Sequence, residues 1–204
     1  MQSIFTVTEN KLLARSTMKI TLKGDTSLIT RAGQFVNIKL EGCYLRRPIS
    51  VCTKNDTSMT LIYKIVGKGT QILSKVCPGD KLDLLTGLGN GFDTSVKCIS
   101  PLLVGGGAGC APLFMLAETL KKEGKIPSAV LGFNTKDEIF LKDELESIGV
   151  KTFIATYDAS EGTKGFVTDA IIKNNIETDY IFACGPYPCL LYTSLQSVLA
   201  LVQA

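Results

Sequence analysis

The stretch from Cys98 to Ala117 contains no charged residue, and it constrains the fold of this chain more than any other segment. About 20 apolar residues can span a bilayer, so its length alone is compatible with a membrane helix. Glycines and prolines interrupt it, however, and in lipid they would leave backbone groups without hydrogen-bond partners. We therefore predict a strand at Leu102–Gly105, a glycine loop, and a helix with Pro112 in its first turn.

The residues after this loop alternate between apolar runs and helical patterns. Such alternation predicts a doubly wound parallel sheet covered by helices on both faces, an α/β nucleotide-binding domain. The further strands expected are Ala129–Phe133, Val150–Thr156 and Tyr180–Cys184, and the helices are Asp137–Ser147, Val167–Asn174 and Leu190–Val202.

The first half of the chain has a different sequence pattern, with short runs rich in valine, isoleucine, threonine and phenylalanine. About six strands and one brief helix near Gln71–Val76 predict a closed antiparallel Greek-key β-barrel. With the boundary near Lys97–Pro101, the two expected domains are residues 1–98 and 99–204. The expected strands are Ile4–Glu9, Leu12–Leu22, Gln34–Leu40, Pro48–Thr53, Met59–Val66 and Lys81–Leu85.

The chain contains no histidine. This excludes histidine-based acid–base catalysis, Ser-His-Asp and Cys-His nucleophile pairs, and histidine-ligated metals from these residues. The 22 lysines and arginines exceed the 19 acidic residues by too little for a dedicated nucleic-acid surface.

The seven cysteines are an odd number, and the amino terminus lacks the pattern of a secretory signal. These features favour a reduced, cytoplasmic protein. Only Cys184 and Cys189 are close in sequence, and their spacing is not Cys-x-x-Cys, so we expect neither a zinc site nor a disulfide framework. The uncharged stretch Tyr180–Ala204 is broken by one glycine and two prolines, so we expect no membrane span.

Four glycines, Gly105, Gly106, Gly107 and Gly109, lie between the expected strand and helix. A glycine-rich turn there lets the backbone approach a pyrophosphate, and the helix N-terminus supplies N–H donors. The spacing departs from Gly-x-Gly-x-x-Gly because Cys110 stands at the third position. Nucleotide binding is the favoured interpretation, and a tight turn without a ligand is the alternative.

Two adjacent arginines, Arg46 and Arg47, precede Pro48, Ile49 and Ser50 at the start of an expected barrel strand. An arginine can bind phosphate oxygens through two hydrogen bonds, and the strand fixes the serine relative to it. Taken alone, a solvated pair of arginines at a strand edge explains this segment better than a phosphate site.

The segment Gly67-Lys68-Gly69-Thr70 follows the next expected strand and leads into the short helix. Its backbone amides and the Thr70 hydroxyl are suited to face a phosphate. An ordinary turn, with Thr70 as the helix N-cap, is an equal alternative.

Taken together, these motifs resemble the ferredoxin-reductase superfamily, in which a barrel binds FAD and a following α/β domain binds NAD(P)H. The ordered set is Arg-x-x-Ser, Gly-x-Gly-Thr, the glycine loop with Ala-Pro, and Cys-Gly-Pro. More narrowly, residues 47–50, 67–70, 89–92 and 164–169 resemble segments of the electron-transfer subunits of NAD-dependent, type B dihydroorotate dehydrogenases. The resemblance covers essentially the whole chain.

The resemblance implies roles in the barrel. Arg47 would contact the FAD pyrophosphate, and Ser50, at the end of the motif with Pro48 and Ile49, would lie beside the flavin ring near N5. The cradle of the phosphates and the isoalloxazine would be completed by Gly67, Gly69 and Thr70.

The resemblance also implies roles in the α/β domain. The loop Gly105–Gly109 would pass under the NAD pyrophosphate, and Cys184, Gly185 and Pro186 would flank the nicotinamide. Ser50 and Cys184 are thus the candidate catalytic residues. Asn134 ends the second strand of the sheet, where an acidic residue would indicate NAD and an arginine NADP. Asn134-Thr135-Lys136 offers neither, so NAD rests on the resemblance.

The function implied is that of an FAD-containing NAD(P)H oxidoreductase subunit in pyrimidine biosynthesis. It would exchange hydride with NAD(H) and pass electrons to or from a catalytic dihydroorotate dehydrogenase subunit in a hetero-oligomer. Hydride transfer between nicotinamide and flavin needs no protein acid or base, which suits a chain without histidine. The small flavin subunit of another NAD(P)H:ferredoxin or sulfide oxidoreductase complex, and a non-catalytic nucleotide-sensing module, remain alternatives.

One departure from the family concerns iron. The family's subunit ends with a cysteine-rich module that holds a [2Fe–2S] cluster, with the spacing Cys-x4-Cys-x2-Cys. The sequence ends at Ala204, before such a module, and Cys184 and Cys189 match only the first spacing. We therefore expect the ligands of the cluster to be absent from this chain.

The residues Tyr187–Ala204 carry no charge, and leucines and valines cover more than one face of the expected helix. We expect part of this helix to pack against a partner subunit or a missing C-terminal segment. Burial within its own domain is an equal alternative.

Overall fold

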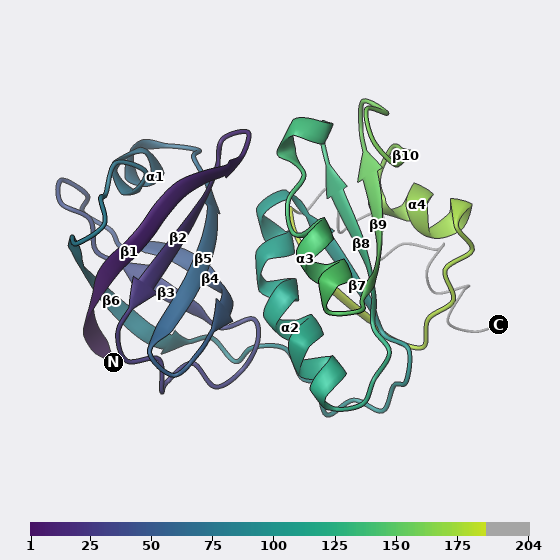
Figure 1. Ribbon diagram of the computed structural model, residues 1–204, viewed down its shortest axis with the longest axis horizontal. Coiled ribbons are helices and arrows are strands. Elements are labelled where there is room, and N and C mark those ends of the chain that lie inside the picture. The colour runs from purple at the N-terminus through teal and green to yellow at the C-terminus, as the bar shows by residue number, and fades with distance from the viewer. Residues whose placement is uncertain (187–204) are drawn as a thin grey trace. The chain divides into compact units, whose positions relative to one another are not determined.

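The computed structural model describes residues 1–186 and divides the chain into two compact units (Figure 1). The first unit is Met1–Phe92, and the second begins at Asp93. Each unit has its own sheet. The border that we expected between residues 98 and 99 lies a few residues after the border between the two units. That it separates an FAD-binding from an NAD-binding domain stays a prediction.

The first unit is a closed barrel of antiparallel strands, as predicted. Its elements are β1 (Gln2–Ala14), β2 (Thr17–Lys23), β3 (Phe35–Ile38), β4 (Arg47–Lys54), β5 (Ser58–Lys64), α1 (Lys68–Leu73) and β6 (Lys81–Leu88). The strand order is β1-β2-β5-β4-β3-β6, and β6 pairs with β1 to close the ring. Because β2 lies beside β5 rather than β3, the barrel has a Greek-key connection.

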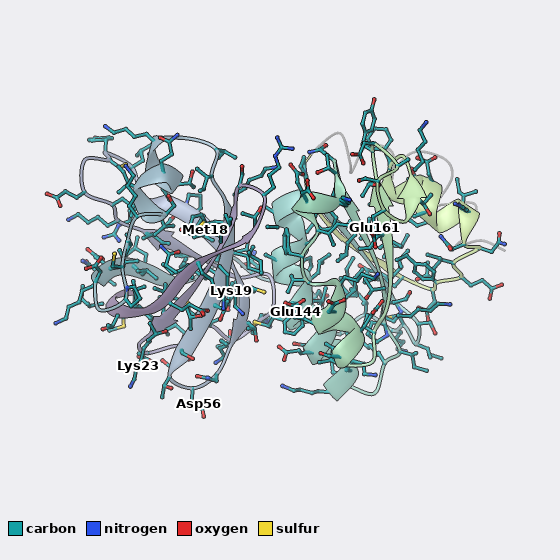
Figure 2. The ribbon with its side chains drawn as sticks, turned by 45° about the horizontal axis from the view of Figure 1, so that its top comes forward. Met18, Lys19, Lys23, Asp56, Glu144 and Glu161 are labelled. Atoms are coloured by element: carbon teal, nitrogen blue, oxygen red, sulfur yellow. The ribbon has the colours of Figure 1, made fainter. Side chains whose placement is uncertain are left out.

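Alternate residues of the strands fill the barrel. On β2, Met18, Ile20 and Leu22 are buried whereas Lys19 is not, which is the period of a strand with one face toward a core (Figure 2). Each fully buried aliphatic side chain contributes about 1.5–3 kcal/mol, so this core stabilises the unit. It includes Phe5, Val7, Ile20, Leu22, Val36, Ile38, Leu61 and Leu84.

Two predicted elements of the barrel are wrong in their bounds. The expected single strand Leu12–Leu22 is split between β1 and β2, which are joined by a tight turn at Arg15 and Ser16. Ser16 adopts the left-handed conformation (φ 56°) that glycine or asparagine usually supplies, so the turn lacked a sequence signal. The short helix begins at Lys68 rather than Gln71.

The second unit is a parallel sheet, as predicted. Its strands are β7 (Leu102–Gly106), β8 (Ser128–Phe133), β9 (Lys151–Thr156), β10 (Thr163–Lys164) and β11 (Ile181–Cys184), and its helices are α2 (Ala111–Lys122), α3 (Lys142–Ser147) and α4 (Val167–Lys173). The strand order is β10-β9-β8-β7-β11. The chain therefore builds outward from β7 in one direction and then returns to add β11 on the other side, which is a doubly wound sheet.

Helices cover both faces of this sheet. Alternate residues of β7 demonstrate it, because Leu102 and Val104 belong to the core beneath α4, whereas Gly105 faces α2. α3 lies beside α2 (Figure 1), and Lys121 Nζ donates a hydrogen bond to the Gly149 carbonyl oxygen just after α3.

The predicted helix Asp137–Ser147 is wrong as a single element. A 3₁₀ turn at Lys136–Glu138 is separated from α3 by an irregular segment in which Leu141 has φ 65°. That break lets Phe140 and Leu141 both be buried, with the Phe140 ring edge-on to Phe133 at 5.3 Å. The gain in burial outweighs the helical hydrogen bonds that are lost.

Within residues 1–186, no helix is long and apolar enough to cross a membrane. The predicted helix Leu190–Val202 lies outside the described residues. The expected packing of Tyr187–Ala204 against a partner or a further segment therefore stays a prediction.

An ion pair fastens the segment before β4 to β6. The Arg46 guanidinium donates hydrogen bonds to both carboxylate oxygens of Asp83 at 3.0 Å and to the Asp83 carbonyl oxygen. The two side chains are only 23% and 18% exposed, so water screens the pair in part. The hydrogen bonds from Arg46 lower the pKa of the Asp83 carboxyl from its ordinary value.

We expect Asp83→Asn to reduce the free energy of unfolding at pH 7 by about 1–2 kcal/mol, because a bidentate charged pair is lost. Since the pKa of Asp83 is lower in the folded than in the unfolded chain, the pair stabilises above about pH 4 and ceases to do so as the pH falls through the folded-state pKa. Urea unfolding of both proteins at pH 7 and pH 2.5 measures the two effects. An equal difference at both pH values would contradict this role.

Candidate functional site

The carboxyl ends of β7 and β11 form one half of the candidate site. Cys184 at the end of β11 lies beside Gly105 in the parallel register. A Cβ atom on Gly109 would fall on the Cys184 carbonyl group, and one on Gly185 would come 3.0 Å from the Gly106 nitrogen. The two loops thus touch backbone to backbone, and only glycine permits the contact.

The glycine loop also brings the strand close to its helix. A Cβ on Gly105 would lie 2.8 Å from the Cys110 sulfur and 2.9 Å from the Leu113 side chain. Gly105 and Gly106 are buried, whereas Gly107 and Gly109 are partly exposed. A 3₁₀ turn, Gly107–Cys110, leads directly into α2, so the free N–H end of a helix faces this edge.

Cys184 is partly buried at the same edge. Burial raises the pKa of its thiol, so the group is a neutral thiol at pH 7. A thiolate is the nucleophilic form of cysteine, and this environment disfavours it. Pro186, also predicted as a site residue, follows in an exposed position.

Two carboxylates that the sequence analysis did not select lie at the ends of β8 and β9. The Asn134 side-chain amide donates a hydrogen bond to Glu138 Oε2 at 3.0 Å. Just after β9, the Ser160 hydroxyl donates to Asp158 Oδ1 at 2.6 Å and accepts from the Lys136 backbone N–H at 2.7 Å. The hydrogen bonds that the Ser160 hydroxyl and backbone N–H donate to Asp158 Oδ1 lower the pKa of the Asp158 carboxyl. The Asp-x-Ser spacing after a strand was the available signal.

The start of β4 and the first turn of α1 form a second cluster, in the barrel. Gly69 is buried, and a Cβ there would overlap the Arg47 guanidinium and its Cδ atom. Arg47 Nη1 donates a hydrogen bond to the Leu45 carbonyl oxygen at 2.6 Å. Among the described residues, the ion pairs of the barrel do not include Arg47. Its charge therefore has no acidic partner there.

The remaining residues of the arginine motif follow along β4. Ile49 pairs with Val36, and Ser50 pairs with Phe35 on β3. Ile49 and Ser50 are partly exposed, and Pro48 is exposed.

Thr70 occupies a different place from the predicted N-cap. Gly67, in an extended conformation, is the N-cap of α1, and Thr70 is the third helical residue. The Thr70 hydroxyl oxygen accepts hydrogen bonds from the N–H groups of Val66 and Gly67 at 2.9 and 3.2 Å. Thr70 thus stabilises the turn from within, and the N-cap interpretation is wrong.

The structure thus brings the predicted residues together in two groups, one in each unit. Arg47, Gly67, Gly69 and Thr70 gather where β4 begins and α1 starts, because β4 and β5 are antiparallel neighbours. The glycine loop and the segment after β11 gather at one sheet edge, at which Asn134 directly follows β8. The cofactor roles of these residues stay predictions.

Comparison with known proteins identifies the family of this chain. Residues 103–192 match the family model of the oxidoreductase NAD-binding domain. The dihydroorotate dehydrogenase B (NAD(+)) electron transfer subunit of Fusobacterium nucleatum is 42% identical over 197 residues, which cover 91% of this chain and 76% of the relative. That of Geobacillus sp. strain WCH70 is 43% identical over 197 residues, covering 93% and 76%. The chain belongs to this family.

Solved structures of other proteins share the fold of this chain. An NADH-dependent reduced ferredoxin-NADP oxidoreductase matches with a TM-score of 0.85 and 30% identity over 96% of this chain and 72% of that one. The FAD/NAD-binding domain of nitric oxide dioxygenase from Vibrio cholerae matches with a TM-score of 0.81 at 22% identity, over 97% and 92%. The second likeness concerns the fold alone. The predicted family and reductase fold are confirmed.

The positions of the cysteines concern the prediction that this chain lacks the ligands of a [2Fe–2S] cluster. Within residues 1–186, no group of three or more cysteine, aspartate or glutamate side chains is placed to hold a metal ion. No disulfide joins the described cysteines either. Where the ligands of the family's cluster lie stays a prediction.

We expect Gly109→Ala to destabilise the second unit by about 1–3 kcal/mol, because its Cβ would force the β7 and β11 loops apart. Ala108→Ser is the matched control, since it enlarges an exposed neighbour in the same loop and should change stability by at most about 0.5 kcal/mol. Urea unfolding monitored by circular dichroism measures both. Equal stability of the two variants would mean that the loops do not need this contact.

Proposed function

We propose that this chain is the FAD-carrying subunit that exchanges hydride with NAD(H) and passes electrons to or from a catalytic dihydroorotate dehydrogenase subunit. Family membership supports the proposal, and the observation that carries it is the Arg47–Gly69 contact. A guanidinium with no acidic partner lies on a glycine of a helix's first turn, and this arrangement suits a diphosphate.

The barrel residues fit FAD. Arg47 would bind the pyrophosphate, helped by the backbone of Gly67 and Gly69. Ser50 lies further along the same strand, and with Pro48 and Ile49 it would border the isoalloxazine ring.

The sheet edge would hold NAD(H). In open α/β sheets, ligands bind where the strand order reverses, and here that point lies between β7 and β11. The pyrophosphate would rest on Gly105–Gly109 at the N-terminal end of α2. Cys184, Gly185 and Pro186 would flank the nicotinamide.

The residues of the chain would bind and orient rather than transfer protons. FAD supplies the two-electron to one-electron conversion when bound. The neutral Cys184 thiol adds no charge beside the nicotinamide. Ser50 and Cys184 would therefore set the approach of the rings, which must bring the reacting atoms within about 3–3.5 Å.

The partner and the direction of flow belong to the same proposal. Electrons would pass from dihydroorotate through the catalytic subunit to FAD and then to NAD⁺, in the cytoplasm.

A second candidate function is that of a small flavin subunit in a ferredoxin-linked complex, favoured by the likeness at 30% identity to an NADH-dependent reduced ferredoxin-NADP oxidoreductase. Purified protein should be yellow, and NADH should bleach its flavin spectrum. Co-purification with a dihydroorotate dehydrogenase favours the first function, and electron exchange with ferredoxin favours the second. A colourless protein that cannot take up FAD contradicts both.

We expect Arg47→Ala to raise the Kd for FAD by about tenfold to a hundredfold, because a bidentate charged contact with phosphate is lost. Arg47→Lys should give a smaller loss, since lysine keeps the charge without the planar fork. Flavin fluorescence quenching measures both.

Lys23→Ala is the control for Arg47→Ala. Lys23 ends β2 at the opposite end of the barrel, where Asp56 also lies (Figure 2). The Lys23→Ala substitution removes a cation far from Arg47 and should leave the Kd for FAD unchanged. If both variants lose FAD equally, Arg47 has no specific role.

We expect Glu138→Gln combined with Asp158→Asn to raise the NADPH-to-NADH ratio of kcat/KM for flavin reduction about fivefold or more. Two carboxylates at the ends of β8 and β9 would repel a 2′-phosphate, and neutralising them removes that repulsion. Stopped-flow reduction of the flavin measures the ratio. Asp143→Asn, an exposed carboxylate of α3, is the control. An unchanged ratio in the double variant would remove these residues from cofactor selection.

A further inference from the structure

Strand β1 contains an irregularity that changes which of its residues face the barrel core. Val7 pairs with Leu22 on β2, but Asn10 pairs with Ile20, so one residue between them, at Thr8, is extra. A bulge of this kind shifts the alternation of inward and outward side chains by one position. It places Asn10 beside the fully buried Ile20, where the pattern of the barrel calls for an apolar residue.

Asn10 uses both its donor hydrogens and its acceptor oxygen at this position. The amide nitrogen donates hydrogen bonds to the carbonyl oxygens of Leu73 and Val76, both at 2.9 Å. The amide oxygen accepts from the Tyr63 hydroxyl at 3.1 Å. Leu73 is the last residue of α1, and its carbonyl oxygen also accepts from the Val76 N–H at 3.2 Å, so Asn10 binds the end of the helix and the turn that follows it.

Tyr63 and the two carbonyl oxygens together fix the orientation of this amide. Its side chain, on β5, is 2% exposed, and burial raises the pKa of its phenol to about 12. The phenol is therefore protonated and donates at neutral pH. Because carbonyl oxygens only accept, the Asn10 nitrogen must face α1 and its oxygen must face Tyr63.

The first turn of the same helix supports Arg47. Gly69 is buried against the Arg47 guanidinium, and there is no room for even a methyl group between them. Leu73, whose carbonyl oxygen Asn10 binds, has a fully buried side chain that anchors the far end of the helix. α1 is about 9 Å long, so a shift at its Asn10 end is transmitted to the surface on which Arg47 lies.

We propose that Asn10, oriented by Tyr63, is a positioning residue for Arg47. It sets the distance of α1 from β1 and, through Gly69, the place of the guanidinium. This inference rests on the proposed function, in which Arg47 binds the phosphates of FAD. Asn10 itself touches neither Arg47 nor FAD in this scheme.

The first test measures FAD binding to the full chain by flavin fluorescence quenching. Asn10→Ala removes both hydrogen bonds to α1 and should raise the Kd for FAD about fivefold to tenfold. Tyr63→Phe keeps the volume of the side chain and removes only the hydroxyl, so it should raise the Kd about twofold to threefold.

The second test separates positioning from general stability. In an Arg47→Ala background, Asn10→Ala should change the Kd by less than about twofold, because the group that it positions is gone. A residue that acts only on the stability of the barrel would give the same fold-change in both backgrounds. Should Asn10→Ala fail to fold, Tyr63→Phe goes through the same cycle and must show the same loss of effect.

Asn55→Ala is the matched control. Its side-chain oxygen accepts hydrogen bonds from the N–H groups of Thr57 and Ser58 in the β4–β5 turn, at the end of the barrel away from α1. It should leave the Kd for FAD unchanged in both backgrounds. A rise as large as that of Asn10→Ala would overturn the proposal.

The outcomes distinguish the proposed function from the positioning role of Asn10. A wild-type chain that does not bind FAD overturns the proposed function and this inference with it. A wild-type chain that binds FAD, with an unchanged Kd in Asn10→Ala or equal fold-changes in both backgrounds, overturns the positioning role alone.

Discussion

The backbone contact between the loops that follow β7 and β11 determines what the second unit can bind. The two strands are parallel neighbours that come from distant parts of the sequence, and Gly109 and Gly185 let their loops touch. Any side chain at these positions would separate the two edges. The contact leaves the N-terminal end of α2 facing a surface made of backbone, which is the kind of surface that a diphosphate can approach closely.

Two adjacent arginines of the barrel, Arg46 and Arg47, make different contacts. Arg46 is engaged by Asp83 in a bidentate pair and fastens the segment before β4 to β6. Arg47, the next residue, contacts backbone carbonyl groups and the surface of Gly69 instead. The first arginine thus holds the strand in place while the charge of the second remains available to a ligand. In the proposed function, the same residue type would serve structure at Arg46 and phosphate binding at Arg47, because the Asp83 carboxylate reaches only Arg46.

The sequence predicted the order of elements well where the signal was local. The barrel, the parallel sheet and the glycine loop followed from residue patterns and from Pro112 in the first turn of α2. It could not predict the break between the 3₁₀ turn and α3, because burial of Phe140 and Leu141 depends on tertiary packing. The turn at Ser16 was missed for lack of a glycine or asparagine.

The candidate site was predictable to the same extent. Motif spacing selected the glycine loop, whereas Arg47 was selected through the resemblance to the family, and the structure then revealed its proximity to Gly69. The sequence motifs gave no reason to choose Asn10, because the bulge that turns this residue inward is visible only in the pairing of β1 with β2. Glu138 was missed because only a hydrogen bond within its own loop, from the Asn134 side chain, holds it near the end of β8. Asp158 was missed although its Asp-x-Ser spacing after β9 was available as a signal.

Two groups that the structure places in the site or behind it, the Cys184 thiol and the Tyr63 phenol, are both held in their neutral forms by burial. Burial raises the pKa of the Cys184 thiol, and the Tyr63 phenol, with a pKa of about 12, is held protonated. Neither of these groups changes its protonation state near neutral pH, and the chain has no histidine. A reaction that needed a proton acceptor would find none among them. Hydride exchange between two stacked rings needs only their alignment, and alignment is what glycine contacts and buried hydrogen bonds can supply.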